Sequence, residues 1–486
     1  MRLNRVRGSL LSLAAAVAGW LAAAPVAGAQ GFGLNEIGTC AVARQAAVTA
    51  APCNDASMIY WNPAAPSSMP GRFSLLLGVA PIGVGGDFTQ DTTGTVFEGD
   101  VPWEFPPHAF LNYSFGDRFK YRWASRVALG LGVYVPYGLT SQWHSDFIGR
   151  FSAQKASLQT IYVQPNLSFE VIPGRLSLGG GPVFGHSTLE LRQSLDLADQ
   201  RLPTGATFGQ IGIARGTEFG RAELKGDGTA WGAHFGAHAR LTPTINVGVR
   251  WLWSMYFDYT GDATFRRVPT ALVLSGQLRA PDGSVALPAG TILDTVLAKN
   301  FATGGLLVDQ DVTTAIKHPG QVQFGIGYTG LEGTQIGIDG QWIRWSDFDA
   351  LPVNFAGPAR VSNRALIEDY EDSWSFRVGA ERNFAGLFKN GFAGRIGYSF
   401  VQTPAPDVTV TPLLPDQDRN NFALGVGVPL GRNWAFDASY LKVDTEGRRG
   451  RVAERPSRTI TDPETLNSGF YRLSANIWSF SLKAQF

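Results

Sequence analysis

Apolar and polar residues alternate regularly along the last segment of the chain. From residue 478 to residue 486 every second residue is apolar, and the residues between them are serine, lysine and glutamine. A period of two predicts a β-strand with one apolar face and one polar face. The same alternation recurs at 421–428 and at 374–379. Soluble sandwiches and membrane barrels both show it, so it predicts strands without deciding between these two folds.

The connections between the predicted strands are alternately long and short along the whole chain. The fourteen predicted strands are 72–86, 106–115, 123–136, 160–171, 176–192, 230–241, 245–257, 320–329, 335–345, 373–383, 391–401, 421–429, 434–443 and 471–486. This alternation and the even strand number are typical of barrels with short periplasmic turns and long outer loops. Lipid offers no hydrogen bonds to an open edge, so the sheet must close. We therefore predict an all-β, 14-stranded antiparallel transmembrane β-barrel with both chain ends on the periplasmic side.

The first 29 residues have the pattern of a secretory signal peptide. Arginines at positions 2, 5 and 7 precede an apolar run over 10–24, and Ala27-Gly28-Ala29 is a small-residue cleavage site. No later segment approaches the ~18 consecutive apolar residues of a membrane helix. The sequence thus predicts an exported protein with a signal peptide (1–29), a segment before the first strand (30–71) and a barrel (72–486).

Residues 30–71 are predicted to form a hatch inside the barrel. This segment lacks sustained alternation, is rich in alanine and contains the aromatic pair Tyr60-Trp61. A barrel of this strand number is too wide for its own side chains to fill, so something must plug it. A flexible periplasmic tail is the alternative, but a linker would be polar or rich in glycine and serine.

The chain has only two cysteines, Cys40 and Cys53, both in the predicted hatch. Export into an oxidising compartment favours a disulfide between them. A metal or redox pair is the alternative, and it has no C-x-x-C spacing and no nearby histidine to support it.

Composition and motifs exclude several classes of function. The 41 Lys and Arg are balanced by 40 Asp and Glu, so the basic footprint of a nucleic-acid binder is missing. No G-x-S-x-G, H-E-x-x-H or P-loop motif occurs, which argues against an enzyme, and nothing indicates a cofactor or a resident metal. Residues 325–330 fit G-x-G-x-x-G, but a strand follows instead of a helix, so we interpret these glycines as keeping the lumen face small.

Several short motifs resemble, in order along the mature chain, those of the FadL-like family of outer-membrane transporters for long-chain fatty acids and aromatic hydrocarbons. They are Gly31-Phe32-Gly33-Leu34-Asn35-Glu36, the hatch motif Asn62-Pro63-Ala64, Tyr134-Val135-Pro136-Tyr137-Gly138-Leu139, Trp345-Ser346-Asp347-Phe348 and Pro415-Asp416-Gln417-Asp418-Arg419. The resemblance implies a fourteen-stranded barrel closed by a hatch, which moves hydrophobic molecules inward without hydrolysing them. It also implies an interior ligand pocket that touches the start of the hatch.

The resemblance implies that Phe32 contacts the ligand and that Leu34, Asn35 and Glu36 beside it are binding or gating residues. Packing of the hatch is the alternative role for Phe32, because buried phenylalanines often serve only the core.

Pro136 and Gly138 are predicted to mark a sideways opening in the wall. Proline lacks the N–H that a strand ladder needs, so Pro136 favours a kink in the third strand, and Gly138 permits the bend. The family places its opening at a kinked third strand. Alternatively, Pro136 only ends this strand. An apolar cargo gains about 0.8 kcal/mol per buried CH₂ by leaving into lipid, which favours lateral exit.

His186 is where we look for the group that holds the cargo's headgroup. Family members that take fatty acids use a basic lumen residue, and no Lys or Arg aligns at this place in the fifth strand. A histidine is mostly neutral at pH 7 at its usual pKa of about 6.5. A neutral or aromatic hydrocarbon therefore competes with a fatty acid as the predicted cargo.

Three further groups have ordinary interpretations. His234 and His238 lie too far apart on a strand, roughly 13 Å, to share one zinc, so we interpret them as lumen polar residues. The acidic residues Glu368, Asp369, Glu371 and Asp372 are expected on a solvated outer loop, with Ca²⁺ as the alternative. Arg448, Arg449 and Arg451 are expected to be solvated, with lipopolysaccharide as an alternative partner.

The sequence therefore predicts a passive importer of hydrophobic small molecules in the outer membrane of a Gram-negative bacterium. Its other expected partners are outer-membrane lipid, lipopolysaccharide and the barrel assembly machinery, because the terminal Phe486 resembles the signal that this machinery recognises. The alternative is a surface barrel that acts as an adhesin or phage receptor through long outer loops, above all the predicted loop 258–319.

Overall fold

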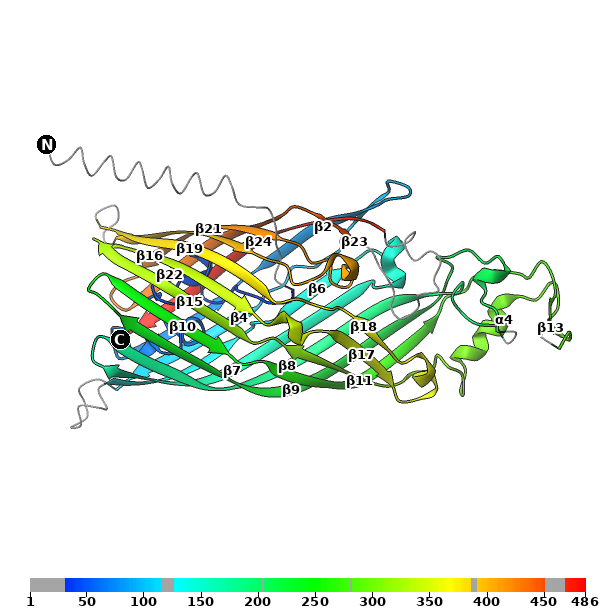
Figure 1. Ribbon diagram of the computed structural model, residues 1–486, viewed down its shortest axis with the longest axis horizontal. Coiled ribbons are helices and arrows are strands. Elements are labelled where there is room, and N and C mark those ends of the chain that lie inside the picture. Colours follow the sequence, from blue (N-terminus) through cyan, green and yellow to red (C-terminus); the bar gives the residue numbers. More distant parts are fainter. Residues whose placement is uncertain (1–30, 116–125, 203–204, 280–281, 386–390, 451–467) are drawn as a thin grey trace.

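The computed structural model describes residues 31–486 except 116–125, 203–204, 280–281, 386–390 and 451–467. The predicted signal peptide therefore lies outside the described residues. Fourteen antiparallel strands form a closed barrel, as predicted. The barrel closes where the first strand pairs with the last, from Ser74 opposite Gln485 to Val79 opposite Phe480. Figure 1 shows the strands tilted along the long axis, with the hatch in blue inside the barrel at the end where the C-terminus lies.

Four of the fourteen barrel strands are interrupted and appear as two pieces each. The pieces are β1 (Phe73–Val79) with β2 (Ile82–Gln90), β5 (Val127–Tyr134) with β6 (Gly138–Gln142), β10 (Ile245–Leu252) with β11 (Met255–Arg267), and β14 (Gln310–His318) with β15 (Gln321–Leu331). Three of these interruptions contain a proline, Pro81, Pro136 or Pro319, which cannot donate to the ladder.

The other ten barrel strands are continuous. They are β4 (Pro107–Ser114), β7 (Lys155–Ile172), β8 (Leu176–Asp196), β9 (Glu218–Arg240), β16 (Thr334–Ile343), β19 (Ser373–Phe384), β20 (Phe392–Val401), β21 (Arg419–Pro429), β22 (Trp434–Thr445) and β24 (Gly469–Gln485). The short outer strands are β3 (Val96–Glu98), β12 (Leu278–Arg279), β13 (Val285–Leu287), β17 (Ala350–Phe355), β18 (Arg364–Ile367) and β23 (Arg448–Gly450).

The helices of the described residues are short. They are α2 (Thr39–Ala43), α3 (Met58–Trp61), α4 (Leu293–Leu297), and the 3-10 turns η1 (Ala65–Ser68), η4 (Ile148–Phe151), η5 (Gly209–Ile211), η6 (Ala298–Phe301), η7 (Trp345–Asp347), η8 (Pro358–Ser362) and η9 (Asp407–Thr409). Within the described part of the chain, no helix combines the length and the apolar character needed to cross a membrane.

The predicted bounds of the sixth, seventh and eighth strands are wrong at their outer ends. The sixth strand begins at Glu218 instead of 230, and the two ends of the predicted loop 258–319, residues 258–267 and 310–318, belong to β11 and β14. These extensions turn polar residues such as Arg221, Lys225 and Asp258 outward and bury Ala222, Ala263 and Phe265 on the other face, so they lack the apolar outer face on which the prediction relied. Ion pairs also join neighbouring strands of the extended wall, including Lys155–Glu190 and Arg192–Glu223. Figure 1 shows the extension projecting beyond the other strands and ending near α4.

The wall has an apolar outer face and a polar inner face in its shorter strands. In β24, Trp478, Phe480 and Leu482 are exposed, whereas Ser479 and Ser481 are buried inside. This inside-out arrangement is that of a barrel whose outer face meets lipid.

Glycines on the inner face bring the wall close to the hatch backbone. At Gly248, Gly327, Gly337 and Gly379, a β-carbon would lie 2.0 to 2.4 Å from a carbonyl oxygen of the hatch. A side chain at any of these four positions, on β10, β15, β16 and β19, would push the hatch away. The prediction that glycines such as Gly327 keep the lumen face small is confirmed, and it accounts in part for the 58 glycines of the chain.

Candidate functional site

The third barrel strand breaks where the hatch begins. β5 ends at Tyr134 and β6 starts at Gly138, so Pro136 kinks the strand instead of ending it. The start of the hatch pairs with the broken edge, because the Leu34 N–H donates to the Pro136 carbonyl and the Gly138 N–H donates to the Phe32 carbonyl, each at 2.9 Å. The hatch thus supplies the backbone partners that the kink leaves without a neighbouring strand.

The wall opposite β6 is also irregular. β4 begins only at Pro107, and the residues before it bond to the first strand, where Glu104 and Ile82 exchange two hydrogen bonds. Pro106 and Pro107 have no N–H to offer toward β6. Further out, the wall closes again where the Asp100 N–H donates to the Gln142 carbonyl. The backbone ladder is therefore interrupted between 101–107 and 135–141, and we call this interruption the wall gap.

A side-chain hydrogen bond crosses the wall gap. The Thr140 hydroxyl on β6 donates to Oε1 of Glu104 at 2.8 Å. On the outer side, Trp103 and Phe105 are exposed beside the gap. The gap thus has an apolar outer rim and one polar contact across it.

A cavity of about 320 Å³ lies between the wall gap and the hatch. Its apolar lining includes Ile82, Val84, Leu139, Leu158 and Ile477. The start of the hatch contributes Gly31, Gly33, Leu34 and Glu36, and the gap contributes Glu104 and Gly138. The cavity therefore touches both the hatch and the interrupted wall.

An acidic residue of the outer region fixes the start of the hatch. The Gly31 N–H donates to Oδ2 of Asp416 at 2.8 Å, and the Thr403 hydroxyl donates to the same oxygen at 2.9 Å. Arg419 lies 3.4 Å from the other carboxylate oxygen. Burial raises the pKa of Asp416, and these partners oppose the rise. Burial likewise raises the pKa of Glu36, against the nearby charge of Arg419.

Phe32 is enclosed by aromatic rings and is not among the residues that line the cavity. Its ring packs edge-on against Trp345 at 4.7 Å and Phe348 at 5.2 Å between centroids, with Tyr137 and His318 close by. Phe32 is 2% exposed. The geometry favours an anchoring role, in which Phe32 places Gly31, Gly33 and Leu34 against the cavity. Asn35 is half-buried and also stands outside the cavity lining.

The expected position of His186 is wrong. It lies on the exposed face of β8, opposite Ile161 and Thr229 of the neighbouring strands, while Gly185 and Ser187 point inward. The strand begins at Leu176, as predicted, but successive side chains point to opposite faces, so His186 points outward between its two inward neighbours. His186 does not line the cavity.

His234 and His238 do face the lumen, and each has its own partner. Nδ1 of His234 lies 3.0 Å from Oε1 of Gln164, and Nε2 of His238 lies 3.3 Å from the Ala50 carbonyl oxygen. The interpretation as lumen polar residues is confirmed.

The hatch motif ties the hatch to the wall. The Asn62 side-chain amide donates to the carbonyls of Thr49 and Ala237, and its oxygen accepts the Ala64 N–H. The Pro63 carbonyl accepts a hydrogen bond from Asn166 of β7 at 3.0 Å. These contacts explain a structural role for Asn62-Pro63-Ala64.

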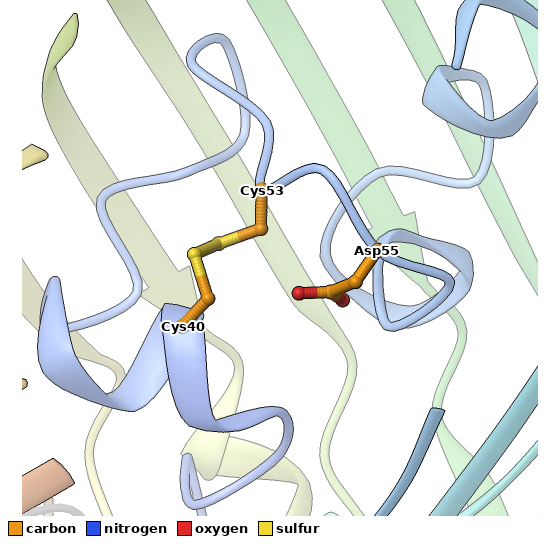
Figure 2. A group of neighbouring side chains, drawn as sticks. All are labelled: Cys40, Cys53 and Asp55. Carbon is orange, nitrogen blue, oxygen red and sulfur yellow. A yellow bond between two sulfur atoms is a disulfide. The ribbon is translucent and has the colours of Figure 1, made fainter. Parts of the chain in front are cut away.

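Cys40 and Cys53 form a disulfide, as the sequence predicts. With Asp55 they are the one group of possible metal donors that the described residues bring together (Figure 2). The sulfurs are bonded to each other, so this group is a covalent link within the hatch and not a metal site.

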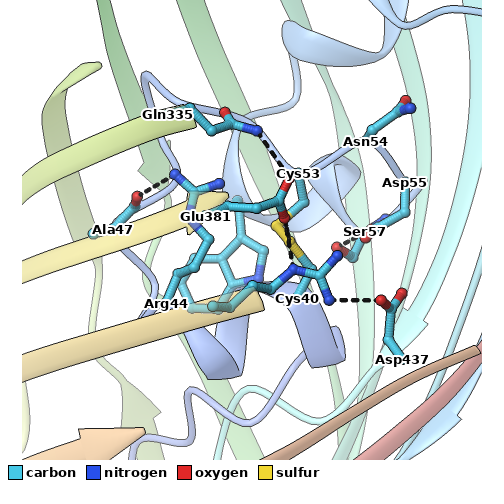
Figure 3. The surroundings of a disulfide bond; sticks show 12 residues. Cys40, Arg44, Ala47, Cys53, Asn54, Asp55, Ser57, Gln335, Glu381 and Asp437 are labelled. Atoms are coloured by element: carbon cyan, nitrogen blue, oxygen red, sulfur yellow. Dashed lines mark hydrogen bonds and ion pairs between the residues drawn. A yellow bond between two sulfur atoms is a disulfide. The ribbon is translucent and has the colours of Figure 1, made fainter. Parts of the chain in front are cut away.

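The disulfide lies beside a buried ionic network of the wall (Figure 3). Arg395 bonds to Glu381 and to Asp437, both at 2.6 Å, and Lys483 lies 3.3 Å from Asp437. Oε2 of Glu381 is 3.6 Å from the Cys40 sulfur. The covalent loop of the hatch thus packs directly on paired charges of the barrel.

The acidic outer loop is only partly solvated, which corrects our expectation for Glu368. Its side chain is buried, and burial followed by the charge of Asp369 raises its pKa to about 8. Glu371 and Asp372 are exposed, as expected, and Asp369 is half-buried. The loop folds back because the Glu368 and Asp369 N–H groups both donate to the Asp349 carbonyl.

Two of the three outer arginines bond to acidic residues of other loops. Arg448 pairs with Asp407 and Arg449 pairs with Asp91. Arg451 lies outside the described residues.

Comparison with known proteins shows which family has this architecture. Residues 20–486 match the family described as outer membrane protein transport protein (OMPP1/FadL/TodX). The chain belongs to this family. The OMPP1/FadL/TodX family consists of channels for hydrophobic compounds, not enzymes, and its members reside in the outer membrane of Gram-negative bacteria. The predicted resemblance, fold class and location are therefore confirmed.

Individual relatives are distant in sequence. A protein of Neisseria meningitidis serogroup B (strain ATCC BAA-335 / MC58), named as an outer membrane protein, is 23% identical over 466 residues, which cover 92% of each chain. A solved FadL homologue of Pseudomonas aeruginosa has a TM-score of 0.73 at 20% identity, covering 94% of this chain and 100% of that one. The Ralstonia pickettii toluene transporter TbuX has a TM-score of 0.61 at 18% identity, covering 93% and 99%. At these identities the structures show a shared fold.

Sequence reasoning missed the residues that the outer segments bring to the site. Glu104 lies in a predicted loop. The one local feature that could have indicated a functional role is the sequence Trp103-Glu104-Phe105-Pro106-Pro107, in which aromatic residues and prolines surround one acidic residue. Asp416 and Arg419 belong to a motif that resembles the family, but the sequence indicates no function for either residue.

Proposed function

We propose that this chain carries hydrophobic small molecules from the cell surface into the outer membrane through the cavity and the wall gap. The observation that carries the proposal is the cavity itself, which is bounded on one side by the start of the hatch and on the other by the interrupted third strand. A molecule in this cavity contacts the groups that hold the hatch in place and lies directly behind the gap. Binding and release can therefore share one location.

Lateral release fits the physical chemistry of an apolar cargo. Each CH₂ group gains about 0.8 kcal/mol by moving from water into an apolar medium. Crossing an aqueous periplasm forgoes this gain, whereas passing between 101–107 and 135–141 into lipid keeps it. The Pro136 kink, the prolines of the opposite edge and the apolar rim at Trp103 and Phe105 all support this route.

In this proposal the start of the hatch is the part that moves when a ligand binds. Its first residues hold their position through a few hydrogen bonds, to Pro136, Gly138 and Asp416, and through the rings around Phe32. A ligand in the cavity competes with these contacts, since Gly31, Gly33 and Leu34 form part of the lining. We therefore assign Phe32 to anchoring and Leu34 and Glu36 to ligand contact.

Filling the gap tests the route. A β-carbon at Gly138 meets Leu34 at 3.0 Å and Leu158 at 3.4 Å, so Gly138→Phe places a ring in the cavity without a collision below 3 Å at its first atom. Gly85→Phe is the matched control, because that position of β2 is open space. We expect Gly138→Phe to abolish uptake of a radiolabelled hydrophobic compound by whole cells and Gly85→Phe to preserve it. Uptake unaffected by Gly138→Phe contradicts the proposal.

A surface receptor is the second candidate function, and the outer extension favours it. The outer end of β9 and the segments beyond β8 and β11 build a small apolar core of their own, with Leu197, Phe208, Phe219, Leu293 and Leu297. An ordered projection of this kind can present a binding surface. Equal uptake by cells with and without the gene, together with loss of phage or host binding in cells without it, would favour this candidate.

A further inference from the structure

The charged side chains around the cavity are mostly acidic. Among the described residues, its lining contains three carboxyl groups, those of Glu36, Glu104 and Asp416, and one cationic side chain, Arg419. The remaining lining is apolar or uncharged. A ligand headgroup that enters this cavity therefore meets more carboxyl groups than cations.

The single cation is already engaged by acidic neighbours. Arg419 lies 3.4 Å from a carboxylate oxygen of Asp416, and its charge also acts on Glu36. A chain processed after Ala29 would add one ammonium group next to Gly31, whose N–H already meets Asp416. Three carboxyl groups still outnumber the two cations. The lining therefore offers a ligand carboxylate no cation that lacks an acidic neighbour.

Glu104 places a carboxyl group on the exit route itself. It accepts the hydrogen bond from Thr140 that crosses the wall gap, and it lines the cavity behind the gap. The lining beside it combines apolar side chains such as Ile82 and Leu139 with uncharged polar ones such as Thr140, and none of these carries a positive charge that would offset a second negative charge. Like charges repel strongly in surroundings of low polarity.

We propose that the cavity selects uncharged hydrophobic molecules and rejects those that carry a carboxylate, with Glu104 and Glu36 setting this preference. The inference rests on the proposed function, and it names the class of cargo that the acidic lining admits. Straight-chain alcohols and hydrocarbons belong to this class, whereas ionised fatty acids do not.

Trp143 provides a direct signal for ligand in the cavity. It lines the cavity, is 3% exposed, and holds its place through a stacking contact with Phe147 and a hydrogen bond to the Pro412 carbonyl. A bromine atom that reaches an indole quenches its fluorescence. The probes are ω-bromoundecanol and ω-bromoundecanoate, which share a chain and differ in the charge of the headgroup. Trp143→Phe identifies the part of the quenching that comes from the cavity.

At near-neutral pH we expect the purified full-length protein to bind the bromoalcohol about tenfold or more tightly than the bromocarboxylate. Glu104→Gln combined with Glu36→Gln should raise the affinity for the carboxylate about tenfold and leave that for the alcohol nearly unchanged. Glutamine keeps an oxygen that accepts from Thr140 and from the Asn35 N–H, so the hydrogen bonds survive. Asp146→Asn, at an exposed residue near Trp143 that does not line the cavity, should change neither affinity.

Each other outcome overturns one specific statement. If the carboxylate binds as tightly as the alcohol or more tightly, the charge preference is wrong while the cavity remains a ligand site. If the preference exists but survives the double substitution, Glu36 and Glu104 do not set it. If neither probe quenches the Trp143 component, the cavity does not bind hydrophobic ligands and the proposed function itself fails.

Discussion

The backbone N–H of Gly31 donates a 2.8 Å hydrogen bond to the Asp416 carboxylate, although 385 residues separate the two in sequence. The contact joins the first described residue of the hatch to the outer segment that precedes β21. On its other side, the start of the hatch pairs with the broken third strand. The hatch therefore begins in a position held by both the outer region and the wall gap, and loss of either contact should free it.

Removing the Asp416 carboxylate should release the start of the hatch. Asp416→Ala leaves the buried Gly31 N–H without an acceptor, which costs about 1 to 3 kcal/mol locally. We expect faster hydrogen exchange at residues 31–36 and faster uptake of small hydrophobic compounds. Asp407→Ala is the control, because it removes an exposed carboxylate that pairs with Arg448 and does not touch the hatch. Unchanged exchange at 31–36 would show that Asp416 does not hold the hatch.

Truncating Phe32 should loosen the same segment from the other side. Phe32→Ala empties a cage formed by Trp345, Phe348 and Tyr137, at a cost of about 3 to 5 kcal/mol if the site stays rigid. Hydrogen exchange at 31–34 should quicken while the barrel keeps its thermal transition. If exchange stays slow and only ligand affinity falls, Phe32 is a ligand contact and its anchoring role is refuted.

The disulfide should stabilise the hatch without being needed by the barrel. Cys40 and Cys53 close a short loop that lies on the paired charges of Glu381 and Arg395. Replacing both cysteines by alanine should lower hatch stability by about 2 to 4 kcal/mol. Limited proteolysis should then cut within residues 31–71 at lower denaturant, while the folded barrel keeps its shifted electrophoretic mobility. Joint unfolding of hatch and barrel in the variant would contradict this division.

Glu368 should make the outer loop less stable as pH rises. Burial raises its pKa from 4.5 to about 8, so the folded protein keeps a proton that the unfolded chain releases above about 4.5. The stabilising contribution is complete below pH 4.5 and is lost as pH rises to about 8. Its size is on the order of a few kcal/mol. Glu368→Gln should remove this slope in a pH series of loop proteolysis, whereas exposed Glu371→Gln should keep it; a slope unchanged in Glu368→Gln would refute the assignment.

The pattern of the sequence predicts the barrel well and its outer parts poorly. Residues that face lipid must be apolar, so alternation marks strands such as β21 and β24 to within a few residues. Above the membrane that constraint ends. The outer parts of β9 and β11 turn polar residues outward and bury Ala222, Ala263 and Phe265 on the other face, so they lack the apolar outer face that marks the other strands. His186 was misplaced for a related reason, because a polar residue in a half-exposed strand does not reveal which face it takes.

The sequence predicts only those features of the candidate site that depend on the chemistry of a single residue or of a few neighbouring residues. The kink at Pro136 follows from the missing N–H of proline, and the disulfide follows from two cysteines in an exported chain. Glu104, Asp416 and Arg419 come together through pairing of segments far apart in sequence, and nothing in their immediate neighbours indicates a shared cavity. The packing of Phe32 likewise depends on rings from several outer segments.

Closing the wall gap with a reversible crosslink tests the central claim most directly. Glu104 and Thr140 face each other across the gap, so Glu104→Cys with Thr140→Cys places one thiol on each rim, and a short bis-methanethiosulfonate reagent should join the two through disulfide bonds. The control pair is Tyr113→Cys with Leu129→Cys, at directly opposed positions of the intact β4–β5 ladder. We predict that crosslinking the gap pair with this reagent reduces uptake of an uncharged hydrophobic compound to the level of cells without the gene, that the same treatment of the control pair does not, and that mild reduction restores uptake. Full uptake through a completely crosslinked gap would contradict lateral release.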